Sequence, residues 1–382
     1  MDFELSEEQR LLKESVGRLL ADRYGFEQRT AYMKEPGGFS RALWKQYAEL
    51  GLLALPFAET DGGLGGNPVD VMIVMEAFGS ALVLEPYFAT VVLAGGVLRH
   101  AGSDKQRAEI VPKIAGGSLL LALAHSERQS RYDLADVAMT AKKDGAGYVL
   151  DGAKGIVLHG DSADKLIVSA RVAGKQRDRD GIGLFLIDAK APGVSIRGYQ
   201  TVDGLHAAEI ALSGVKVGPD GILGEPGKAL PVIERAVDEA MAALCAEAVG
   251  AMTVMHEVTI DYLKTRKQFG VPIGNFQVLQ HAAADMLIAT EQARSMALLA
   301  AMMAGENNAV ERHKSIAAAK IQIGRSGRFV GKTATQLHGG IGMTMEYKVG
   351  HYFKRAVAID ILFGDADHHL AALTRMGGLL AA

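Results

Sequence analysis

The chain has 382 residues, of which 49% are hydrophobic and 22% are charged, and its formal net charge is -3. This length is greater than a single hydrophobic core usually supports, so we expect two or three packed units of a globular protein. The interspersed charges exclude the basic face of a nucleic-acid-binding protein and the polybasic run that anionic lipids attract. The composition therefore favours a folded enzyme with neither nucleic acid nor membrane as partner.

The cysteine content and the first residues limit the possible disulfides, metal sites and cellular location of the protein. Cys245 is the only cysteine, which excludes an internal disulfide and a multi-thiolate metal site, and its apolar neighbours predict a core position. The segment from Met1 to Leu5 is acidic where a secretory signal would be basic. In the sequence, charged or polar groups interrupt each apolar stretch before it reaches bilayer length. We therefore expect a cytoplasmic protein without membrane insertion.

The first third of the chain has the pattern of a helical domain. Ser6 and Gln9 form the pattern of a capping box, and leucine and valine then recur at helical spacing, so a helix should begin near Ser6. Helical patterns continue over residues 40–52 and 68–115, separated by a glycine-rich loop at 61–68. These segments predict an N-terminal α-helical domain over residues 1–117.

The remaining two thirds have different patterns. Short runs typical of β-strands follow residue 118 and are separated by glycine-rich turns, at 148–150, 165–168 and 183–187. They predict a β domain over residues 118–227, with no strand after Gly227. Long Ala-, Met- and Leu-rich segments then have helical spacing, at about 229–265, 275–305, 309–337 and 346–376. They predict a four-helix bundle over 228–382, and its alanine-rich surface near 282–304 favours packing between subunits.

Two segments could carry chemistry. Residues 266–277 form a charged and aromatic turn between apolar helices, in which Arg266 can pair with a phosphate. Residues 336–342 are the end of a helix that runs into glycines, whose bare backbone lets a cofactor approach closely. Either segment alone could equally be a plain turn, with Gly339 and Gly340 ending a helix and Arg266 complementing a helix dipole.

Together, on a chain with a helix, β, helix order, the two segments closely resemble the second-half signatures of acyl-CoA dehydrogenases, and the resemblance covers essentially the whole chain. It implies an α+β multidomain fold with an N-terminal helical domain, a central β-barrel and a C-terminal four-helix bundle. It also implies FAD as cofactor, α,β-dehydrogenation of an acyl-CoA thioester, and an electron-transfer flavoprotein as acceptor. In that reaction a carboxylate removes the α-proton while the β-hydrogen leaves as hydride.

By similarity to that family, both segments would supply cofactor contacts. Arg266 would contact the FAD pyrophosphate, Phe269 the adenosine end, and Gln277 the nearby part of the cofactor. The adenine side would lie against Gln336, Leu337, His338, Gly339 and Gly340. In the family these elements reach across to the FAD of a neighbouring subunit.

The segments that surround the flavin ring in the family are altered here. The isoalloxazine wall usually carries Thr-Glu-Pro followed by Gly-Ser-Asp, whereas residues 125–133 are His-Ser-Glu-Arg-Gln-Ser-Arg-Tyr-Asp. A second segment normally has an aromatic and a hydroxyl residue after a lysine, but Ile156 and Leu158 follow Lys154. Ile156 cannot stack like tryptophan, and Leu158 cannot hydrogen-bond the flavin.

The family's catalytic base is missing at its usual places. Many members carry a glutamate near the C-terminus, where counting gives Gly364 or Phe363, and others carry it on the first bundle helix, at the position of Ala240. Asp365 and Glu239 lie beside these positions and are weak candidates for the base. Asp365 is better interpreted as a cap of the helix that follows it.

The losses form a pattern, because the chain's own flavin-ring contacts and base are degraded while the segments that serve a neighbour's FAD remain. This pattern resembles the small subunits of heteromeric acyl-CoA dehydrogenases, such as those of actinobacterial steroid side-chain degradation, and the pimeloyl-CoA dehydrogenase small subunit is the closest. A larger partner in a heterotetramer would then supply the glutamate and the isoalloxazine pocket. Dicarboxylyl, steroid-derived and simple fatty acyl thioesters all stay open as substrates.

Two other interpretations stay open. A self-sufficient homo-oligomeric enzyme would use Asp365 or Glu239 as base and residues 125–133 as an unusual flavin wall. A non-catalytic structural subunit would use the bundle only as an interaction surface, although packing does not require Arg266. A metal site at His368 and its neighbour is disfavoured, because adjacent helical positions point apart.

Overall fold

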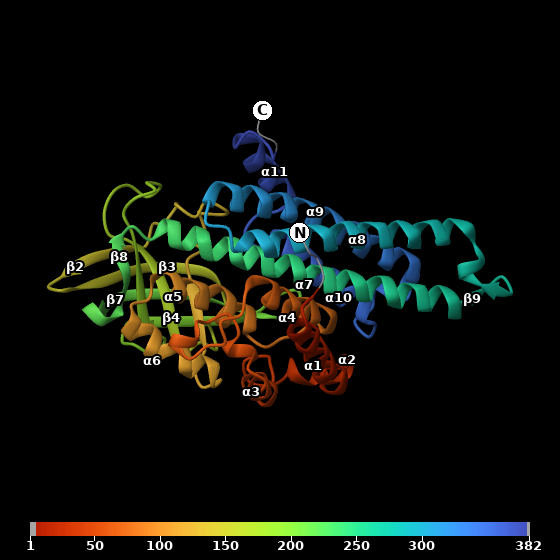
Figure 1. The fold of residues 1–382 in the computed structure, drawn as a ribbon, viewed down its shortest axis with the longest axis horizontal. Coiled ribbons are helices and arrows are strands. Elements are labelled where there is room, and N and C mark those ends of the chain that lie inside the picture. Colours follow the sequence, from red (N-terminus) through yellow and green to blue (C-terminus); the bar gives the residue numbers. More distant parts are fainter. Residues whose placement is uncertain (1–4, 380–382) are drawn as a thin grey trace. The chain divides into compact units, whose positions relative to one another are not determined.

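The structure is a computed structural model that describes residues 5–379 (Figure 1). The chain forms two compact units, each assembled from separate stretches of sequence. One comprises Met1–Thr30, Pro68–Val83 and Met241–Ala382, and the other comprises Ala31–Asn67 and Leu84–Ala240. The division into domains at residues 117 and 227 stays a prediction from sequence.

The first unit begins with α1, which spans Glu7–Arg23. The Ser6 hydroxyl accepts the Gln9 backbone N–H at 3.2 Å, and the Gln9 side chain accepts the Ser6 backbone N–H at 3.1 Å. The predicted capping box and helix start are therefore confirmed. Two further helices come from the N-terminal third, α2 (Phe26–Tyr32, in this unit as far as Thr30) and α4 (Pro68–Ala81).

A bundle of long helices makes up the rest of the first unit. Its helices are α7 (Leu230–Thr265, in this unit from Met241), α8 (Gln277–Ala304), α9 (Ala309–His338), α10 (Lys348–Ile361) and α11 (Ala366–Arg375). By length and composition α7 could cross a membrane, but 67% of its most apolar window is buried within the protein, as in a core helix. Cys245 lies on α7 and is fully buried, which confirms its predicted core position.

Two details of this region differ from the sequence expectation. The predicted fourth helix over 346–376 is two helices, because Phe363 and Gly364 have φ angles of 60° and 117°, which an α-helix cannot contain. Strands also occur after Gly227, since β9 (Lys267–Gln268) pairs with β10 (Val271–Pro272) in a two-residue hairpin.

Buried charges inside the bundle are paired. The guanidinium of Arg355 on α10 donates to both carboxylate oxygens of Glu247 on α7, at 2.6 and 2.8 Å. The fully buried Lys320 on α9 donates to the carbonyls of Ile359 and Leu362 at 2.6 and 3.0 Å. These carbonyls end α10 and lack helical partners, so Lys320 closes the helix where the chain turns toward α11.

The second unit contains short helices and all the longer strands. The helical segments are α3 (Arg41–Glu49), three 3-10 turns (Leu52–Ala54, Glu59–Asp61 and Pro219–Gly221), a π-helical stretch (Phe88–Ala94), α5 (Gly95–Ala101) and α6 (Asp104–Ala115). The strands are β1 (Leu121–Ala124), β2 (Thr140–Asp144), β3 (Gly147–Leu158), β4 (Lys165–Arg171), β5 (Ile182–Asp188), β6 (Val194–Gln200), β7 (His206–Val217) and β8 (Ile222–Gly227). The β-runs expected from the sequence are thus confirmed.

The strands form one mixed sheet in the order β6-β7-β3-β2-β4-β5-β8, with β1 parallel to β4. Six consecutive residues of β4, from Leu166 to Arg171, are buried, as expected for a strand covered on both faces. By contrast, β7 alternates between buried and exposed residues over most of its length. Leu150, Val168, Phe185 and Ile210 meet in the core of this sheet.

A carboxylate fixes the start of α7 to α5 within the second unit. Glu239 lies 2.7 Å from the Arg99 guanidinium, 2.8 Å from the His100 ring and 2.9 Å from the Arg235 guanidinium. Burial alone would raise the pKa of Glu239, but the hydrogen bond from His100 and the charge of Arg99 lower this pKa to about 2. Glu239 is therefore an anion that holds two helices together.

A second carboxylate ends the turn before α11. Asp365 is the N-cap of α11, and its Oδ1 accepts the backbone N–H of His368 at 2.8 Å. This bond satisfies one of the N–H groups that a helix start leaves without an internal partner. The interpretation of Asp365 as a helix cap is confirmed.

Replacement of Glu239 should remove a pH-dependent part of the stability. Its folded pKa is about 2 against an ordinary 4.5, so ionised Glu239 stabilises the fold by on the order of 3 kcal/mol above pH 4.5, and this contribution disappears as the pH falls toward 2. Urea unfolding should show Glu239→Gln less stable at neutral pH, with a difference that shrinks on acidification. Glu257→Gln, at an exposed site on the same helix, should show no such difference. An equal acid loss in wild type and Glu239→Gln would contradict the assignment.

Loss of the Asp365 cap should lower the stability of the protein by a small amount. Asp365→Ala should lower the free energy of unfolding by about 1 kcal/mol, since one N–H at the start of α11 loses its acceptor. Asp365→Ser should recover most of this stability, because serine is also a good N-cap residue. Thermal unfolding measures both changes, and equal losses in the two variants would argue against capping.

Candidate functional site

The structure brings the two motif segments to one end of the bundle. Tyr262, in the last turn of α7, lies with its ring 4.5 Å from that of His338, the last residue of α9, at an interplanar angle of 29°. Arg266 follows Tyr262 by one turn and donates its backbone N–H to the Tyr262 carbonyl at 2.8 Å. Gly339 follows His338 directly. The turn after α7 and the turn after α9 are therefore neighbours, and Figure 1 shows the β9 hairpin at the tip of α7 and α8.

The turn after α7 has an exposed aromatic tip. Phe269 is 92% exposed, has a φ of 54°, and makes an edge contact with Phe276 at 6.1 Å. A bulky residue with positive φ is strained, and a large exposed ring gains little from its own chain. Arg266 and Gln277 are also exposed. Packing within this chain does not explain the turn, whose charged and aromatic groups face outward.

The glycines after α9 leave open space. Gly339 has a φ of 62°, so its own backbone requires glycine, and a Cβ at Gly342 would lie 2.8 Å from the Thr335 carbonyl. At Gly340 neither condition holds, because its φ lies outside the left-handed region and a Cβ would meet nothing within 4 Å. Nothing in this chain requires glycine at that position, so the bare backbone leaves room for a group from outside.

The predicted cofactor residues fall into two groups, one exposed to solvent and one buried. Arg266, Phe269, Gln277, Gln336, Gly339 and Gly340 are exposed, whereas Leu337 and His338 are buried. The Nδ1 of His338 lies 2.8 Å from the Ala334 carbonyl, and its Nε2 lies 3.2 Å from the Tyr347 hydroxyl. Burial lowers the pKa of this histidine. The side chains of Leu337 and His338 therefore pack inside the protein, and their role as cofactor contacts stays a prediction.

Tyr262 and Tyr347 lie against His338 beside the two motif segments, although the sequence did not indicate either of them. Tyr262 stands four residues before Arg266, on the same side of α7 as the start of the motif. Tyr347 immediately precedes α10. An aromatic one helical turn before a functional turn is a weak signal, and only the fold places both rings against His338.

Residues 125–133, compared above with a flavin wall, are held by a buried ion pair within the second unit. Glu127 accepts Lys154 Nζ at 2.7 Å and the backbone N–H groups of Ala138 and Met139 at 2.9 and 3.1 Å. Burial lowers the pKa of Lys154 to about 8; burial would raise the pKa of Glu127, but the Lys154 charge and hydrogen bond lower it overall. Glu127 therefore has a structural role, and the sequence did not identify Lys154 as its partner.

The segment after Lys154 keeps an irregular backbone without the expected side chains. The pairing of β3 with β7 shifts register between Lys154 and Val157, and Ile156 has a φ of 52°. A β-branched residue with positive φ is strained. Ile156 is 59% exposed. The bulge thus presents an aliphatic side chain where the family pattern has an aromatic one.

Both candidate bases make structural contacts within this chain. A general base needs a free lone pair and a pKa near the working pH. Glu239 is paired with cations and has a pKa of about 2, and Asp365 accepts a backbone N–H of α11. Among residues 5–379, no group of three or more His, Cys, Asp and Glu could hold a metal ion.

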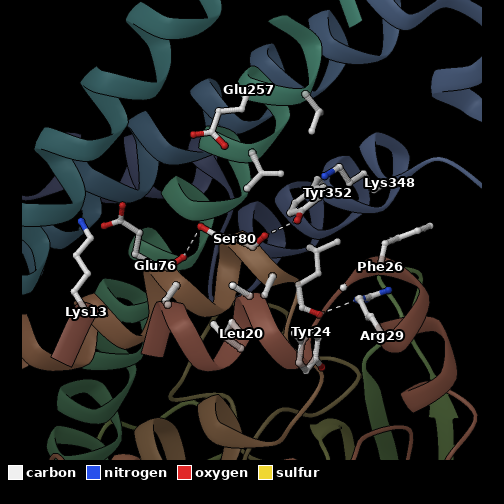
Figure 2. Close-up of a pocket in the computed structure, with 18 of the residues that line it drawn as sticks. Lys13, Leu20, Tyr24, Phe26, Arg29, Glu76, Ser80, Glu257, Lys348 and Tyr352 are labelled. Carbon is white, nitrogen blue, oxygen red and sulfur yellow. Dashed lines mark hydrogen bonds between the residues drawn. The ribbon is translucent and has the colours of Figure 1, made fainter. Parts of the chain in front are cut away.

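A separate groove lies in the first unit. Its cavity of about 640 Å³ is lined by α1, α2, α4, α7 and α10, and Figure 2 shows Lys13 and Glu76 toward one end and Arg29 and Lys348 toward the other. Gly17, inside α1, lines this groove, and a Cβ there would meet nothing within 4 Å. The predicted site residues are not among its lining residues, so the groove is distinct from the two motif segments.

Comparison with known proteins agrees with these features. Family models described as the N-terminal, middle and C-terminal domains of acyl-CoA dehydrogenase match residues 6–118, 122–215 and 228–377. The chain is 29% identical to "Probable acyl-CoA dehydrogenase YngJ" of Bacillus subtilis (strain 168), over 98% of this chain and 99% of that protein.

Solved structures give the same result over the full length. A variant of the Tcur3481-Tcur3483 steroid ACAD is similar with a TM-score of 0.86 and 30% identity, covering 97% of each chain. The ChsE4-ChsE5 complex from Mycobacterium tuberculosis is similar with a TM-score of 0.88 and 25% identity, covering 100% of each chain. The predicted arrangement of a helical N-terminal domain, a middle sheet domain and a C-terminal helical bundle is confirmed. The chain belongs to the acyl-CoA dehydrogenase family, whose cofactor is FAD and whose members are oxidoreductases that act on the CH–CH bond of acyl-CoA thioesters.

Proposed function

We propose that this chain is the small subunit of a heteromeric acyl-CoA dehydrogenase. A larger partner, assembled with it as a heterotetramer, supplies the catalytic glutamate and most of the isoalloxazine pocket. This chain completes the FAD cleft with the turns at 266–277 and 336–340. The observation that carries the proposal is the contrast between these outward-facing turns and the altered flavin-ring and base positions of the same chain.

The outward-facing turns have the chemistry that FAD requires. The Arg266 guanidinium suits a pyrophosphate, and the exposed ring of Phe269 suits the adenosine end. Gln277 and Gln336 offer amides for hydrogen bonds, and Gly339 and Gly340 let the adenine approach the backbone. The open space at Gly340 is the cradle that fits this group, since a side chain there would fill it. FAD, when bound, supplies the hydride acceptor for the reaction.

The chain's own base and ring positions support the need for a partner. Glu239 and Asp365 are both occupied by structural interactions, and Ile156 and Leu158 lack the aromatic and hydroxyl groups that face a flavin in the family. A subunit with these residues needs a carboxylate from elsewhere to remove the α-proton. The solved relatives support this view, because one of them is a complex of two different proteins, ChsE4 and ChsE5.

The substrate assignment rests on the resemblance stated above. The chain resembles the pimeloyl-CoA dehydrogenase small subunit in overall pattern, which favours a dicarboxylyl-CoA thioester in fatty acid or dicarboxylic acid degradation. The similarity to a steroid ACAD keeps a steroid-derived acyl-CoA as the alternative. We place the enzyme in the cytoplasm, with an electron-transfer flavoprotein as acceptor.

The split of the site between subunits predicts a difference in colour. The chain purified alone should lack the flavin absorption band and should not oxidise acyl-CoA. Co-expression with its larger partner should give a yellow complex that oxidises acyl-CoA. Visible absorption and turnover measure both outcomes, and stoichiometric flavin with turnover in the lone chain would overturn the proposal.

Substitution at Gly340 should separate folding from cofactor binding. Gly340→Val should leave the unfolding temperature nearly unchanged, since no neighbour lies within 4 Å of its Cβ, but should lower FAD affinity in the complex by at least about tenfold through steric block. Gly17→Ala is the matched control at another open glycine, distant from the cofactor segments in sequence. It should raise stability by roughly 0.5–1 kcal/mol without changing FAD affinity. Unchanged FAD affinity in Gly340→Val would remove this turn from the site.

A further inference from the structure

His338 lies in a closed cluster between the two proposed cofactor segments. Its ring stacks on Tyr262 of α7 at 4.5 Å and lies 5.0 Å from the ring of Tyr347, which precedes α10. The residue is 3% exposed. Three parts of the bundle therefore meet at one imidazole.

The hydrogen bonds of His338 determine its tautomer. Nδ1 lies 2.8 Å from the Ala334 carbonyl, which can only accept, so Nδ1 carries the proton. Nε2 then has a lone pair that accepts the Tyr347 hydroxyl at 3.2 Å. Burial lowers the pKa of the ring, in agreement with a neutral imidazole. One nitrogen thus fixes the ring to its own helix, and the other fixes it to the start of α10.

We propose that His338 is a positioning residue that fixes the distance between Arg266 and the backbone of Gly339 and Gly340. The inference rests on the proposed FAD site and assigns His338 no contact with the cofactor. Arg266 is bonded to Tyr262 through its backbone, and Gly339 is covalently next to His338. Stacking of Tyr262 on His338 therefore couples the group that faces the pyrophosphate to the turn that faces the adenine.

The coupling gives His338 two separable effects. Any buried residue contributes to stability through its packing, but a positioning residue also sets the geometry that a ligand meets. His338→Phe keeps an aromatic ring beside Tyr262 and removes both hydrogen bonds. Tyr347→Phe keeps the ring of Tyr347 and removes only its donor to Nε2.

Affinity for FAD in the complex with the larger subunit is the first test. After removal of the flavin, titration with FAD should show a dissociation constant that is roughly three- to tenfold larger in His338→Phe than in wild type. The dissociation constant should rise less in Tyr347→Phe. The double variant should bind no more weakly than His338→Phe, because both substitutions break one chain of contacts. Additive losses, or unchanged affinity in His338→Phe, would overturn the inference.

Tyr352→Phe is the matched control. The Tyr352 hydroxyl donates to the Ser80 carbonyl in the same unit, and Tyr352 is buried whereas Tyr347 is half-buried. Removal of the Tyr352 hydroxyl should lower the unfolding temperature as Tyr347→Phe does, but FAD affinity should not change. Equal losses of affinity in the two tyrosine variants would show a general effect of stability rather than positioning.

Hydrogen exchange of the lone chain distinguishes failure of the inference from failure of the proposed function. Without any FAD, His338→Phe should speed amide exchange in both 266–276 and 339–343, whereas Tyr352→Phe should not. If exchange rises in neither segment or in only one, the segments are not coupled through His338. If exchange behaves as expected but the wild-type complex binds no FAD, the coupling stands and the proposed function fails.

Discussion

The register between α7 and α10 depends on the buried pair of Glu247 and Arg355. Both groups are nearly inaccessible, and both carboxylate oxygens accept from the guanidinium. Removing one partner of such a pair leaves a buried charge without compensation, at about 3–5 kcal/mol. Because Tyr262 lies further along α7 and Tyr347 lies just before α10, this pair also determines how the two rings approach His338. The geometry of the bundle end that carries the two motif segments thus depends on an interaction elsewhere in the bundle.

Several carboxylates of this chain are engaged in contacts that stabilise the fold. A base that removes a proton from carbon must stay partly free, and its pKa must stay near the working pH. Glu239 and Glu127 are instead surrounded by cations or backbone N–H groups. These contacts stabilise the protein because they favour the ionised form, and the same preference makes the carboxylates poor bases. Stability and proton abstraction place opposite demands on one carboxylate.

Local patterns predicted much of the fold, because they rest on contacts close in sequence. The capping box of Ser6 and Gln9 spans three residues, and the strands near 148–150 and 183–187 follow from residue type and bounding turns. The break at Phe363 and Gly364 escaped prediction, since helical spacing continues across it and only the backbone angles reveal it. The pair of Glu127 and Lys154 escaped for another reason, as it joins residues far apart in the chain.

Likewise, only part of the candidate site could be predicted from the sequence. Its outward-facing residues could be found because charged and aromatic side chains next to glycine are unusual between apolar helices. The sequence could not show that His338 points inward while Gln336 points outward, since both lie at the end of one helix. Tyr347 lies beside His338 because of the way the chain folds before α10, and no local pattern in the sequence indicates this contact.

The exposed tip of the hairpin affects how the isolated chain should behave in solution. Phe269 and Val278 are 92% and 71% exposed, and the ring of Phe276, which contacts that of Phe269, is also partly accessible. A cluster of apolar side chains in water is a common starting point for non-specific association. Once a partner or a nucleotide covers this tip, that driving force disappears. The chain alone should therefore become turbid or self-associate at concentrations at which the proposed complex stays monodisperse.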